Sequence, residues 1–522
     1  MPDPDVIVIG AGHNGLICAA YLARSGLHVQ VVERRRIAGG CAATEEMAPG
    51  VKVSRCFCDH VTLHTTPIPT ELELERYGLE NLSFDPFHYA PSAQGEGLVF
   101  WKDLERTADA IAERNPKDAR AYRRFVREWG ELFEWLQPVL LGSPRPAAVT
   151  WRMAKRPMHA LRGLSKLPLI QRALKASLKN LLDETFEDPH LKGVLAFITA
   201  GMAGLPPSAP QSAMLAFGAV LPHLVGIRRP RGGSGGLIRA LVGALERHGG
   251  TVRTGAAAVR VQVADGTVRS VRLVDGEEIG ARFVVAACDP LTTFKRLLDP
   301  DAVPQEIRSA LSRVRVANGV ALKVEYLIDR LPEWAPHPRI TPGEQAAATK
   351  LICPSIDHLE RAYAEYLEKR NPRAPALLVG TATALDPGLV PDNQHLLTVE
   401  TRYSPYELQG NVPWSSIREA EARRMLELLQ PCLASDLTTA VRLTIPQTPE
   451  DLERDLGLPR GQITHLDVSP EQRLHRRPIP QLSGYRTPIR GLYLTGAGTH
   501  PGGGIWGAPG RNTAHVVLED VA

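Results

Sequence analysis

The sequence predicts an α/β fold in which a Rossmann-like domain is assembled from separated parts of the chain and a discontinuous mixed α+β domain fills the rest. Three observations favour this fold. The chain opens with a strand, a glycine-rich turn, a helix and a second strand; α/β character returns at residues 230–290; and a strand, a glycine-rich turn and a helix close the chain. Helical periodicity dominates much of the stretch between the first two segments, as expected for a separate domain.

The first of these segments has the pattern of a phosphate-binding turn. Residues 6–9 are a short, apolar, β-branched run, which is typical of a buried parallel strand. A G-x-G-x-x-G motif follows, formed by Gly10, Gly12 and Gly15. Apolar residues spaced along 14–25 predict a helix packed on a sheet, and Glu33 ends the next strand, 18 residues after the last glycine.

This arrangement predicts that a dinucleotide binds at the start of the helix. Glycines let the backbone approach a pyrophosphate, and the helix N-terminus, which includes Asn14, supplies N–H donors and a positive dipole. Glu33 is the carboxylate expected to hold a ribose hydroxyl, and Arg34 beside it is a further candidate contact. A carboxylate at the ribose favours NAD or FAD over a cofactor with a 2′-phosphate.

The bulk composition is that of an ordinary globular protein and excludes several classes of partner. The chain has 522 residues, of which 43% are hydrophobic and 23% charged, and its net charge of +4 is too small to predict nucleic-acid binding. Its seven cysteines are odd in number and sparse, so no disulfide framework is expected. Cys56 and Cys58, with His60 and His64 nearby, do not have zinc-site spacing, and no metal is predicted.

The expected location is the cytoplasm. Asp3 and Asp5 stand where a signal peptide would be basic, and no uninterrupted apolar stretch reaches about 18 residues. Peripheral contact with a membrane stays open at this point. The sequence does not fix the oligomeric state, for which a homodimer is one possibility.

A glycine pair follows the acidic residue, and here the chain resembles a known family. The run from Arg34 continues through Gly39, Gly40 and Cys41 to Thr44. It resembles the FAD-binding signature of the flavin amine oxidase and phytoene desaturase superfamily, in which such a pair lies beside the flavin. The family usually has Arg where this chain has Cys41, a departure found in desaturase-like members. The resemblance therefore implies FAD contacts at Gly39, Gly40 and Cys41.

Two later segments extend the resemblance. Residues 230–290 resemble the second FAD segment of the family, which implies that Val259 contacts the adenine through its backbone. Residues 489–517 resemble the C-terminal FAD motif of phytoene desaturase-like proteins, with T-H-P-G-G-G and then G-A-P-G-R-N. The contacts implied there are Gly496, Gly503, Gly504 and Ile505. Since no cysteine follows Cys432, the FAD is expected to be bound non-covalently.

These segments define the expected domains. The FAD-binding domain is predicted to comprise residues 1–70, 228–300 and 485–522, and the substrate-binding or cap domain residues 71–227 and 301–484. Residues 191–227 are apolar and are predicted either to line a cavity or to form core. Residues 151–180 are expected to be helical, with leucines among basic residues; a solvated helix face is the favoured interpretation and a membrane-surface face the alternative.

The implied activity is hydride transfer between a carbon of a hydrophobic substrate and the N5 atom of FAD, with C–C desaturation of a polyene or other natural product favoured. One alternative is a flavin amine oxidase, and a second is a non-catalytic FAD-binding assembly or scaffold protein. The candidate bases are His500, inside the C-terminal glycine run, and His60. For His500 a structural hydrogen bond is an equally weighted alternative.

Overall fold

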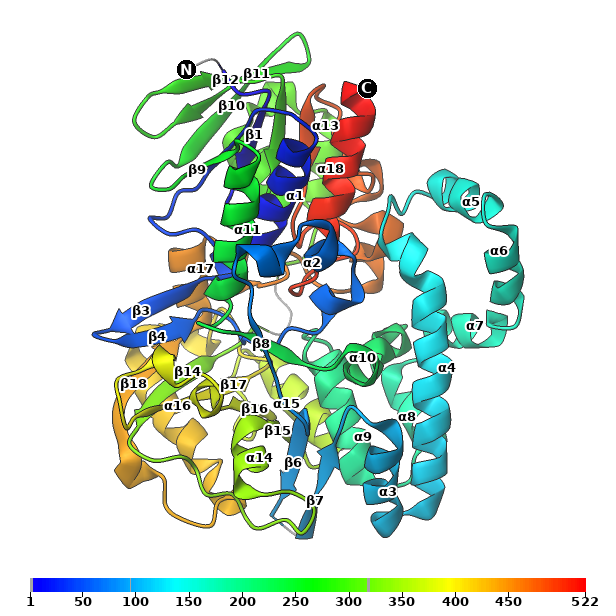
Figure 1. The fold of residues 1–522 in the computed structure, drawn as a ribbon, viewed down its shortest axis with the longest axis vertical. Helices are drawn as coiled ribbons and strands as arrows, with labels where there is room; N and C mark the ends of the chain where they lie inside the picture. Colours follow the sequence, from blue (N-terminus) through cyan, green and yellow to red (C-terminus); the bar gives the residue numbers. More distant parts are fainter. Residues whose placement is uncertain (1–2, 94, 317–319) are drawn as a thin grey trace.

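The computed structural model of the protein describes residues 3–93, 95–316 and 320–522 (Figure 1). Parts of the predicted domains that fall on residues 1–2, 94 and 317–319 lie outside this description. In the described residues, no helix has the length and apolarity needed to cross a bilayer.

Five described strands form a parallel sheet in one half of the molecule. Their order is β19-β13-β1-β2-β9, and each neighbouring pair is parallel. The strands are β1 (Val6–Ile9), β2 (Val29–Val32), β9 (Thr251–Arg253), β13 (Phe283–Ala286) and β19 (Leu492–Leu494). They come from three separated parts of the chain, so the sheet forms only when these parts meet. All five lie within residues 1–70, 228–300 and 485–522, although the domain boundaries themselves stay a prediction.

Layers on both faces bury this sheet, which is why its strands read as continuous apolar runs. Side chains of a strand alternate between its faces. Val6 and Val8 join a core with the helices α1 (His13–Arg24), α11 (Gly235–Arg247) and α18 (Ala508–Val521). Ile7 and Ile9 join another with an antiparallel sheet. That sheet consists of β10 (Ala258–Ala264), β11 (Thr267–Leu273) and β12 (Glu278–Gly280).

A second, mixed sheet of seven described strands lies in the other half of the molecule. Its order is β18-β14-β17-β16-β15-β6-β7, and only β15 and β6 pair in parallel. The strands are β6 (His88–Ser92), β7 (Gly95–Phe100), β14 (Lys323–Ile328), β15 (Thr349–Ile352), β16 (Leu377–Gly380), β17 (His395–Thr401) and β18 (Val441–Gln447). Short pairs, β3 (Thr44–Ala48) with β4 (Val51–Ser54) and β5 (Asn81–Ser83) with β8 (Arg228–Pro230), complete the described strands.

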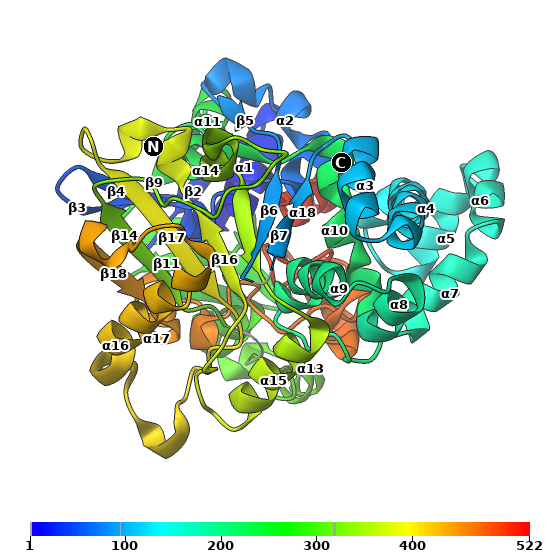
Figure 2. The ribbon, with the colours of Figure 1, turned by 90° about the horizontal axis from the view of Figure 1, so that it is seen from below.

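Helices surround the second sheet (Figure 2). One group lies beside β6 and β7: α3 (Leu104–Arg114), α4 (Pro116–Leu140), α8 (Leu178–Thr185), α9 (Pro189–Ala196) and α10 (Phe217–Val225). Others are α14 (Pro342–Ala347), α15 (Ile356–Leu367), α16 (Trp414–Glu427) and α17 (Pro449–Leu456). The helix α13 (Gln305–Leu311) packs instead on the parallel sheet, in the core that contains Ile7 and Ile9. The short helices α2 (Ile68–Glu71) and α12 (Pro290–Thr292) belong to the connections.

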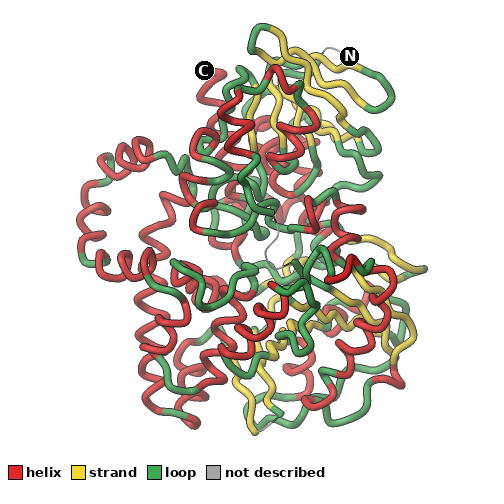
Figure 3. The backbone as a smooth tube through the Cα atoms, turned by 180° about the vertical axis from the view of Figure 1, so that it is seen from behind, coloured by secondary structure: helices red, strands yellow, loops and turns green. Residues whose placement is uncertain are grey.

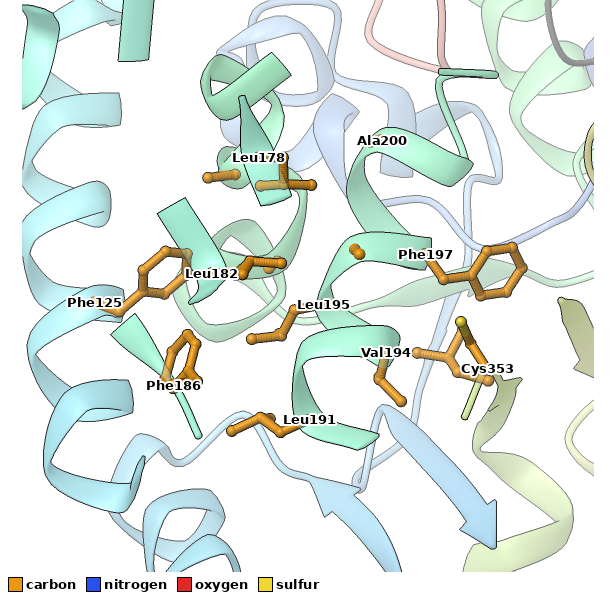
Figure 4. Close-up of a cluster of buried hydrophobic side chains, with 14 of the residues drawn as sticks. Phe125, Leu178, Leu182, Phe186, Leu191, Val194, Leu195, Phe197, Ala200 and Cys353 are labelled. Atoms are coloured by element: carbon orange, nitrogen blue, oxygen red, sulfur yellow. The ribbon is translucent and has the colours of Figure 1, made fainter. Parts of the chain in front are cut away.

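The apolar residues of 191–227 are largely core. Leu191 and Leu195 of α9 face Leu182 and Phe186, while Phe125 of α4 closes the cluster on the other side (Figure 4). Large side chains of this cluster are almost fully buried. Of the two interpretations of this stretch, the structure therefore favours core over the lining of a cavity.

The stretch at 151–180 is helical, and the structure divides it into short helices. It contains α5 (Pro146–Ala154), α6 (Pro157–Leu164) and α7 (Leu167–Lys175) and then enters α8. Prolines occupy the first turn of each of the three, where a missing N–H costs nothing but a preceding helix must end. The three helices form an arch that projects beyond α4 (Figures 1 and 3).

Candidate functional site

The three glycines of the first motif have three different physical roles. Gly10 has φ +107°, which an L side chain rarely adopts. A Cβ on Gly15 would lie 2.2 Å from the carbonyl oxygen of Gly10, so this position packs too closely for any side chain. A Cβ on Gly12 would meet nothing within 4 Å, and Gly12 is the N-cap of α1. The loop is therefore open at the point where the helix dipole favours an anion.

The glycine pair lies directly against this loop. The amide of Gly39 donates to the carbonyl of Ala11 at 2.8 Å, and Gly39 forms a parallel bridge with Gly12. Gly39 and Gly40 have φ +126° and +54°, and a Cβ on Gly39 would lie 2.9 Å from the backbone of Ala43. The two predicted glycine motifs thus form one surface.

Glu33 lies beside the glycine loop, and its contact with a ribose hydroxyl stays a prediction. Its side chain is buried at the end of β2, where Oε2 accepts from the amide of Ala11 and Oε1 from the amide of Arg35, each at 2.9 Å. A carboxylate has further lone pairs with which to accept hydroxyl donors. Arg34 points elsewhere: its guanidinium donates to the carbonyl of Asp455 at 3.1 Å. A cofactor contact for Arg34 stays a prediction.

Val259 lies in an irregular part of β10, near Glu33. The pairing of β10 with β11 shifts register between Ala258 and Arg260, as in a β-bulge, which takes the intervening residue out of the ladder. The amide of Ala256, just upstream, donates to the carbonyl of Glu33 at 2.8 Å. Val259 thus follows a segment that contacts Glu33, and its backbone contact with the adenine stays a prediction.

The C-terminal glycine segment joins the same site through contacts far apart in sequence. Gly496 follows β19 with φ +92°, and a Cβ on it would lie 3.2 Å from the carbonyl oxygen of Ala287. The carbonyl of Ile505 accepts from the hydroxyl of Thr62 at 2.8 Å. Asn14 Oδ1 accepts from the amide of Gly510 at 3.4 Å, which joins the starts of α1 and α18.

Two other glycines of this segment, Gly503 and Gly504, differ in their surroundings. A Cβ on Gly503 would lie 2.6 Å from the side chain of Thr464, so this glycine is required by close packing. Gly504 is exposed, has φ +97°, and its Cβ would be 3.8 Å from Thr62 Oγ1. The open backbone at Gly504 leaves room for a flat ligand.

The thiols of Cys41 and Cys56 share a hydrogen bond, and both cysteines are free. A hydrogen bond with Cys56 raises the pKa of the Cys41 thiol well above its usual value. Cys56 in turn lies near Lys323, Glu400 and Arg402. Through Cys56, Cys41 is therefore linked to charged residues of the second sheet.

Lys323, Glu325, Glu400 and Arg402 form a buried layer of charged residues at the second sheet, called here the charge layer. These charges pair with one another. In the register of β14 with β17, Lys323 is opposite Glu400. Lys323 pairs with Glu325 and Arg402 with Glu400, each at 2.6 Å. Two cations and two anions therefore cancel, and the layer has no excess negative charge.

The two candidate bases are buried and neutral. His60 Nε2 and Ser234 Oγ lie 3.0 Å apart and share a hydrogen bond. His500 Nε2 donates to the carbonyl of Val139 at 3.2 Å, while its Nδ1 has no partner among the described residues. Burial lowers the pKa of His60 to about 3 and that of His500 to about 4. The structural hydrogen bond considered for His500 is present, and a role as base stays a prediction for both residues.

We expect the free energy of unfolding to fall as the pH is lowered from about 6.5 to about 4. Burial lowers the pKa of His60 and His88 to about 3 and that of His500 to about 4. In the unfolded chain these groups bind protons that the folded state does not bind, so acid favours unfolding by about 1.4 kcal/mol per pH unit for each histidine. Urea unfolding across this range measures the slope, and a pH-independent stability would contradict the prediction.

Arg477 is a residue of this site that sequence reasoning missed. It is almost fully buried, and burial lowers its pKa to about 10, so it stays charged at pH 7. Its Nε and Nη2 donate to the carbonyl of Ala497 at 2.9 and 2.8 Å, which fixes the backbone between Gly496 and Gly498. Nη1 donates to the carbonyls of Asp467 and Gln472, and Nη2 also donates to those of Thr464 and Leu466. No motif marked this arginine, because its acceptors are backbone groups.

The site fits a dinucleotide on observations of this structure. The loop is open at Gly12, and the buried atoms Thr495 Oγ1, at the end of β19, and Arg35 Nη1 have no hydrogen-bond partner among the described residues. Buried polar atoms normally have partners, so these fit a ligand with many hydrogen-bonding groups. The described residues contain no group of three or more His, Cys, Asp or Glu placed to hold a metal ion. The fold and the site together indicate a dinucleotide-binding protein.

A cavity in the described part of the chain lies away from this site. It measures about 660 Å³ and is lined by parts of β6, β15, α9 and α15, including His190, Cys353 and His358. None of the predicted cofactor-binding residues lines it. We therefore do not assign this cavity to the cofactor site.

Comparisons with known proteins identify the family. The family model described as "Flavin containing amine oxidoreductase" matches residues 15–518. Pyridine nucleotide-disulfide oxidoreductase domain-containing protein 2 of Rattus norvegicus is 33% identical over 552 residues, covering 100% of this chain and 94% of that protein. One of the subunits of limonene dehydrogenase from Castellaniella defragrans is 27% identical, covering 99% and 95%. The lycopene-forming phytoene desaturase of Pseudescherichia vulneris is 26% identical, covering 99% and 99%.

A solved structure agrees with this assignment at the level of the fold. Putrescine oxidase bound to putrescine has a TM-score of 0.62 and 15% identity, and the match covers 99% of this chain and 98% of that one. The family model spans nearly the whole chain, so the chain belongs to the flavin-containing amine oxidoreductase family. Its cofactor is FAD, and the predicted fold class and family resemblance are confirmed.

Proposed function

We propose that this FAD-dependent oxidoreductase removes a hydride and a proton from adjacent carbons of a hydrophobic substrate and so forms a C=C bond. The observation that carries the proposal is the pattern of full-length sequence relatives, since a limonene dehydrogenase and a phytoene desaturase are both named for hydrocarbons. Putrescine oxidase and cyclohexylamine oxidase match as structures at 15–18% identity, which supports the fold alone.

Residues of this chain would bind the cofactor and accept the proton. Gly12, Gly39 and Gly40 would hold the pyrophosphate region, and Glu33 a ribose hydroxyl. FAD, when bound, supplies a hydride acceptor at N5. A buried imidazole that is neutral at pH 7 is able to accept a proton, and the two candidates are His500, through its unpartnered Nδ1, and His60.

Amine oxidation is the second candidate, favoured by the likeness to putrescine oxidase. It calls for an aromatic pair at the flavin or for negative charge that attracts an ammonium group. Trp506 has no ring contact with another aromatic residue among the described residues. The charges of Glu325 and Glu400 are already neutralised by Lys323 and Arg402. The neutralised charges support a hydrocarbon substrate over an amine.

Anaerobic reduction of the bound flavin tests the proposal. We expect limonene, phytoene or related polyenes to bleach the oxidised flavin spectrum, and putrescine and cyclohexylamine to leave it unchanged. Reduction by amines alone would assign the protein to amine oxidation. Reduction by neither class, although dithionite reduces the flavin, would favour the non-catalytic alternative.

Matched histidine variants extend this experiment. If His500 is the base, His500→Gln lowers the rate of flavin reduction by roughly 10²- to 10⁴-fold while flavin content is unchanged. His60→Gln serves as the comparison, because His60 has a side-chain partner in Ser234. A rate that His500→Gln leaves unchanged would restrict His500 to its hydrogen bond with Val139.

A further inference from the structure

The arch formed by α5, α6 and α7 exposes an unusual concentration of large apolar side chains. Of the thirteen exposed large hydrophobic residues found in the described part of the chain, six lie between residues 151 and 174. They are Trp151, Met158, Leu161, Leu164, Leu167 and Leu174. Met158, Leu161 and Leu164 of α6 are 68%, 58% and 60% exposed. Scattered single apolar residues are normal on a surface, whereas a cluster on a projecting element indicates a binding surface.

The same stretch is free of acidic residues. Residues 135–182 contain no Asp or Glu, although a stretch of this length would hold about five at the average frequency of the chain. They contain nine basic residues: Arg145, Arg152, Lys155, Arg156, Arg162, Lys166, Arg172, Lys175 and Lys179. Arg156, Arg162 and Lys175 are exposed and have no ion-pair partner among the described residues. The surface therefore combines apolar side chains with an excess of positive charge.

Specific contacts with α4 hold the arch in place, so the orientation of its exposed face is fixed by the fold. The rings of Trp135, in α4, and His159 stack with centroids 5.8 Å apart. Trp135 Nε1 donates to the carbonyl of His159, and His159 Nε2 donates to the carbonyl of Trp135, each at 2.9 Å. A Cβ on Gly163 would lie 2.5 Å from the Trp135 ring, which shows how closely α6 approaches α4. The inner side of α6 is thus fixed, and its leucines face outward.

We propose that the arch docks on the surface of an anionic lipid bilayer. Short helices with outward leucines and a tryptophan insert into the interface between headgroups and acyl chains, and basic residues attract anionic headgroups. The absence of acidic residues in this stretch disfavours a two-fold interface in which the arches of two copies meet, because two such surfaces would repel each other. This proposal concerns where the protein binds and goes beyond the reaction proposed above.

The arch is also connected to the cofactor site. It begins just after α4, whose last turns accept hydrogen bonds from the C-terminal segment: Val139 from His500 Nε2 at 3.2 Å and Leu140 from Asn512 Nδ2 at 3.0 Å. A protein docked through the arch would therefore hold the end of α4 and the adjoining cofactor segment near the bilayer. A substrate that partitions into lipid would be taken up over a short path.

Co-sedimentation of the full-length flavin-loaded protein with vesicles tests the proposal. We expect binding to mixed phosphatidylcholine–phosphatidylglycerol vesicles that weakens with salt, and much weaker binding to pure phosphatidylcholine. Replacing three exposed basic residues together, by Arg156→Gln, Arg162→Gln and Lys175→Gln, should lower the affinity for the anionic vesicles about 100-fold, at about fivefold per charge. The triple change Met158→Ser, Leu161→Ser and Leu164→Ser should lower it at least tenfold.

A control pair with equally exposed apolar residues elsewhere is Val274→Ser with Leu367→Ser, at 65% and 64% exposure. It should bind vesicles as the unaltered protein does. Equal binding by the unaltered protein and the α6 variant would overturn the proposal, as would a monomer–dimer equilibrium that the α6 variant abolishes in the absence of vesicle binding. Flavin content and reduction are measured on the same samples, so that a failure of lipid docking is distinguished from a failure of the proposed reaction.

Discussion

Gly12→Asp is expected to abolish FAD binding while leaving the protein folded. Gly12 has φ −68° and ψ 163°, which any residue adopts, and a Cβ there meets nothing within 4 Å. Because Gly12 is the N-cap of α1, a carboxylate here is a favourable helix cap. The same carboxylate would occupy the position of the pyrophosphate. Two like charges about 4 Å apart repel by roughly 4 kcal/mol near a protein surface, so we expect a loss of affinity of about 1,000-fold.

Flavin content after gel filtration and titration of the flavin-free protein with FAD measure this effect. Gly12→Ser is the matched control, because a serine hydroxyl also caps the helix but carries no charge. It should bind FAD far more tightly than Gly12→Asp does, and both variants should unfold at the same urea concentration when flavin-free. If Gly12→Asp purified with a full complement of FAD, the cradle described here would not be the cofactor site.

Local signals in the sequence were sufficient for the parts of the site that one segment forms. The strand, glycine turn, helix and acid at residues 6–33 were predictable because each feature depends on near neighbours in the chain. The structure adds why each glycine is needed: Gly10 for its backbone angle, Gly15 for its contact with the Gly10 carbonyl and Gly12 for open space. The final strand and α18 were predictable for the same reason.

Contacts between distant segments were beyond this kind of reasoning. Nothing in the sequence indicates that His60 shares a hydrogen bond with Ser234, or that the hydroxyl of Thr62 donates to the carbonyl of Ile505. Such pairs depend on how the interleaved segments meet. Residues 151–180 were predicted to be helical without internal boundaries, and the structure divides the stretch into short helices that begin at Pro157 and near Pro168.

The apolar stretch at 191–227 shows a further limit. Apolar composition predicts burial but not whether the buried surface faces protein or ligand. The structure shows that these side chains are largely packed against α4 and α8, so the stretch no longer supports an apolar substrate pocket. The proposal of a hydrophobic substrate therefore depends on the relatives and on the neutral charge layer near Cys56.

Arg477→Met is expected to be among the most destabilising single substitutions in the chain. The side chain is 1% exposed and donates to five backbone carbonyls, of Thr464, Leu466, Asp467, Gln472 and Ala497. Methionine has a similar length but no donor, so these carbonyls would lose a charged partner in a dry environment. Leaving buried polar groups unpaired in this way costs about 3–5 kcal/mol in the free energy of unfolding.

Urea unfolding of the flavin-free protein measures the loss, and the variants used for comparison separate its causes. Arg477→Lys keeps the charge but reaches fewer carbonyls, so it should recover only part of the stability. Arg423→Met, on the exposed face of α16, should change the free energy of unfolding by less than about 0.5 kcal/mol. Because Arg477 fixes Ala497 between two glycines of the C-terminal segment, Arg477→Met should also weaken FAD binding under conditions in which it remains folded. A variant as stable as the unaltered protein would mean that water replaces the guanidinium, and the burial of Arg477 would then have little energetic weight.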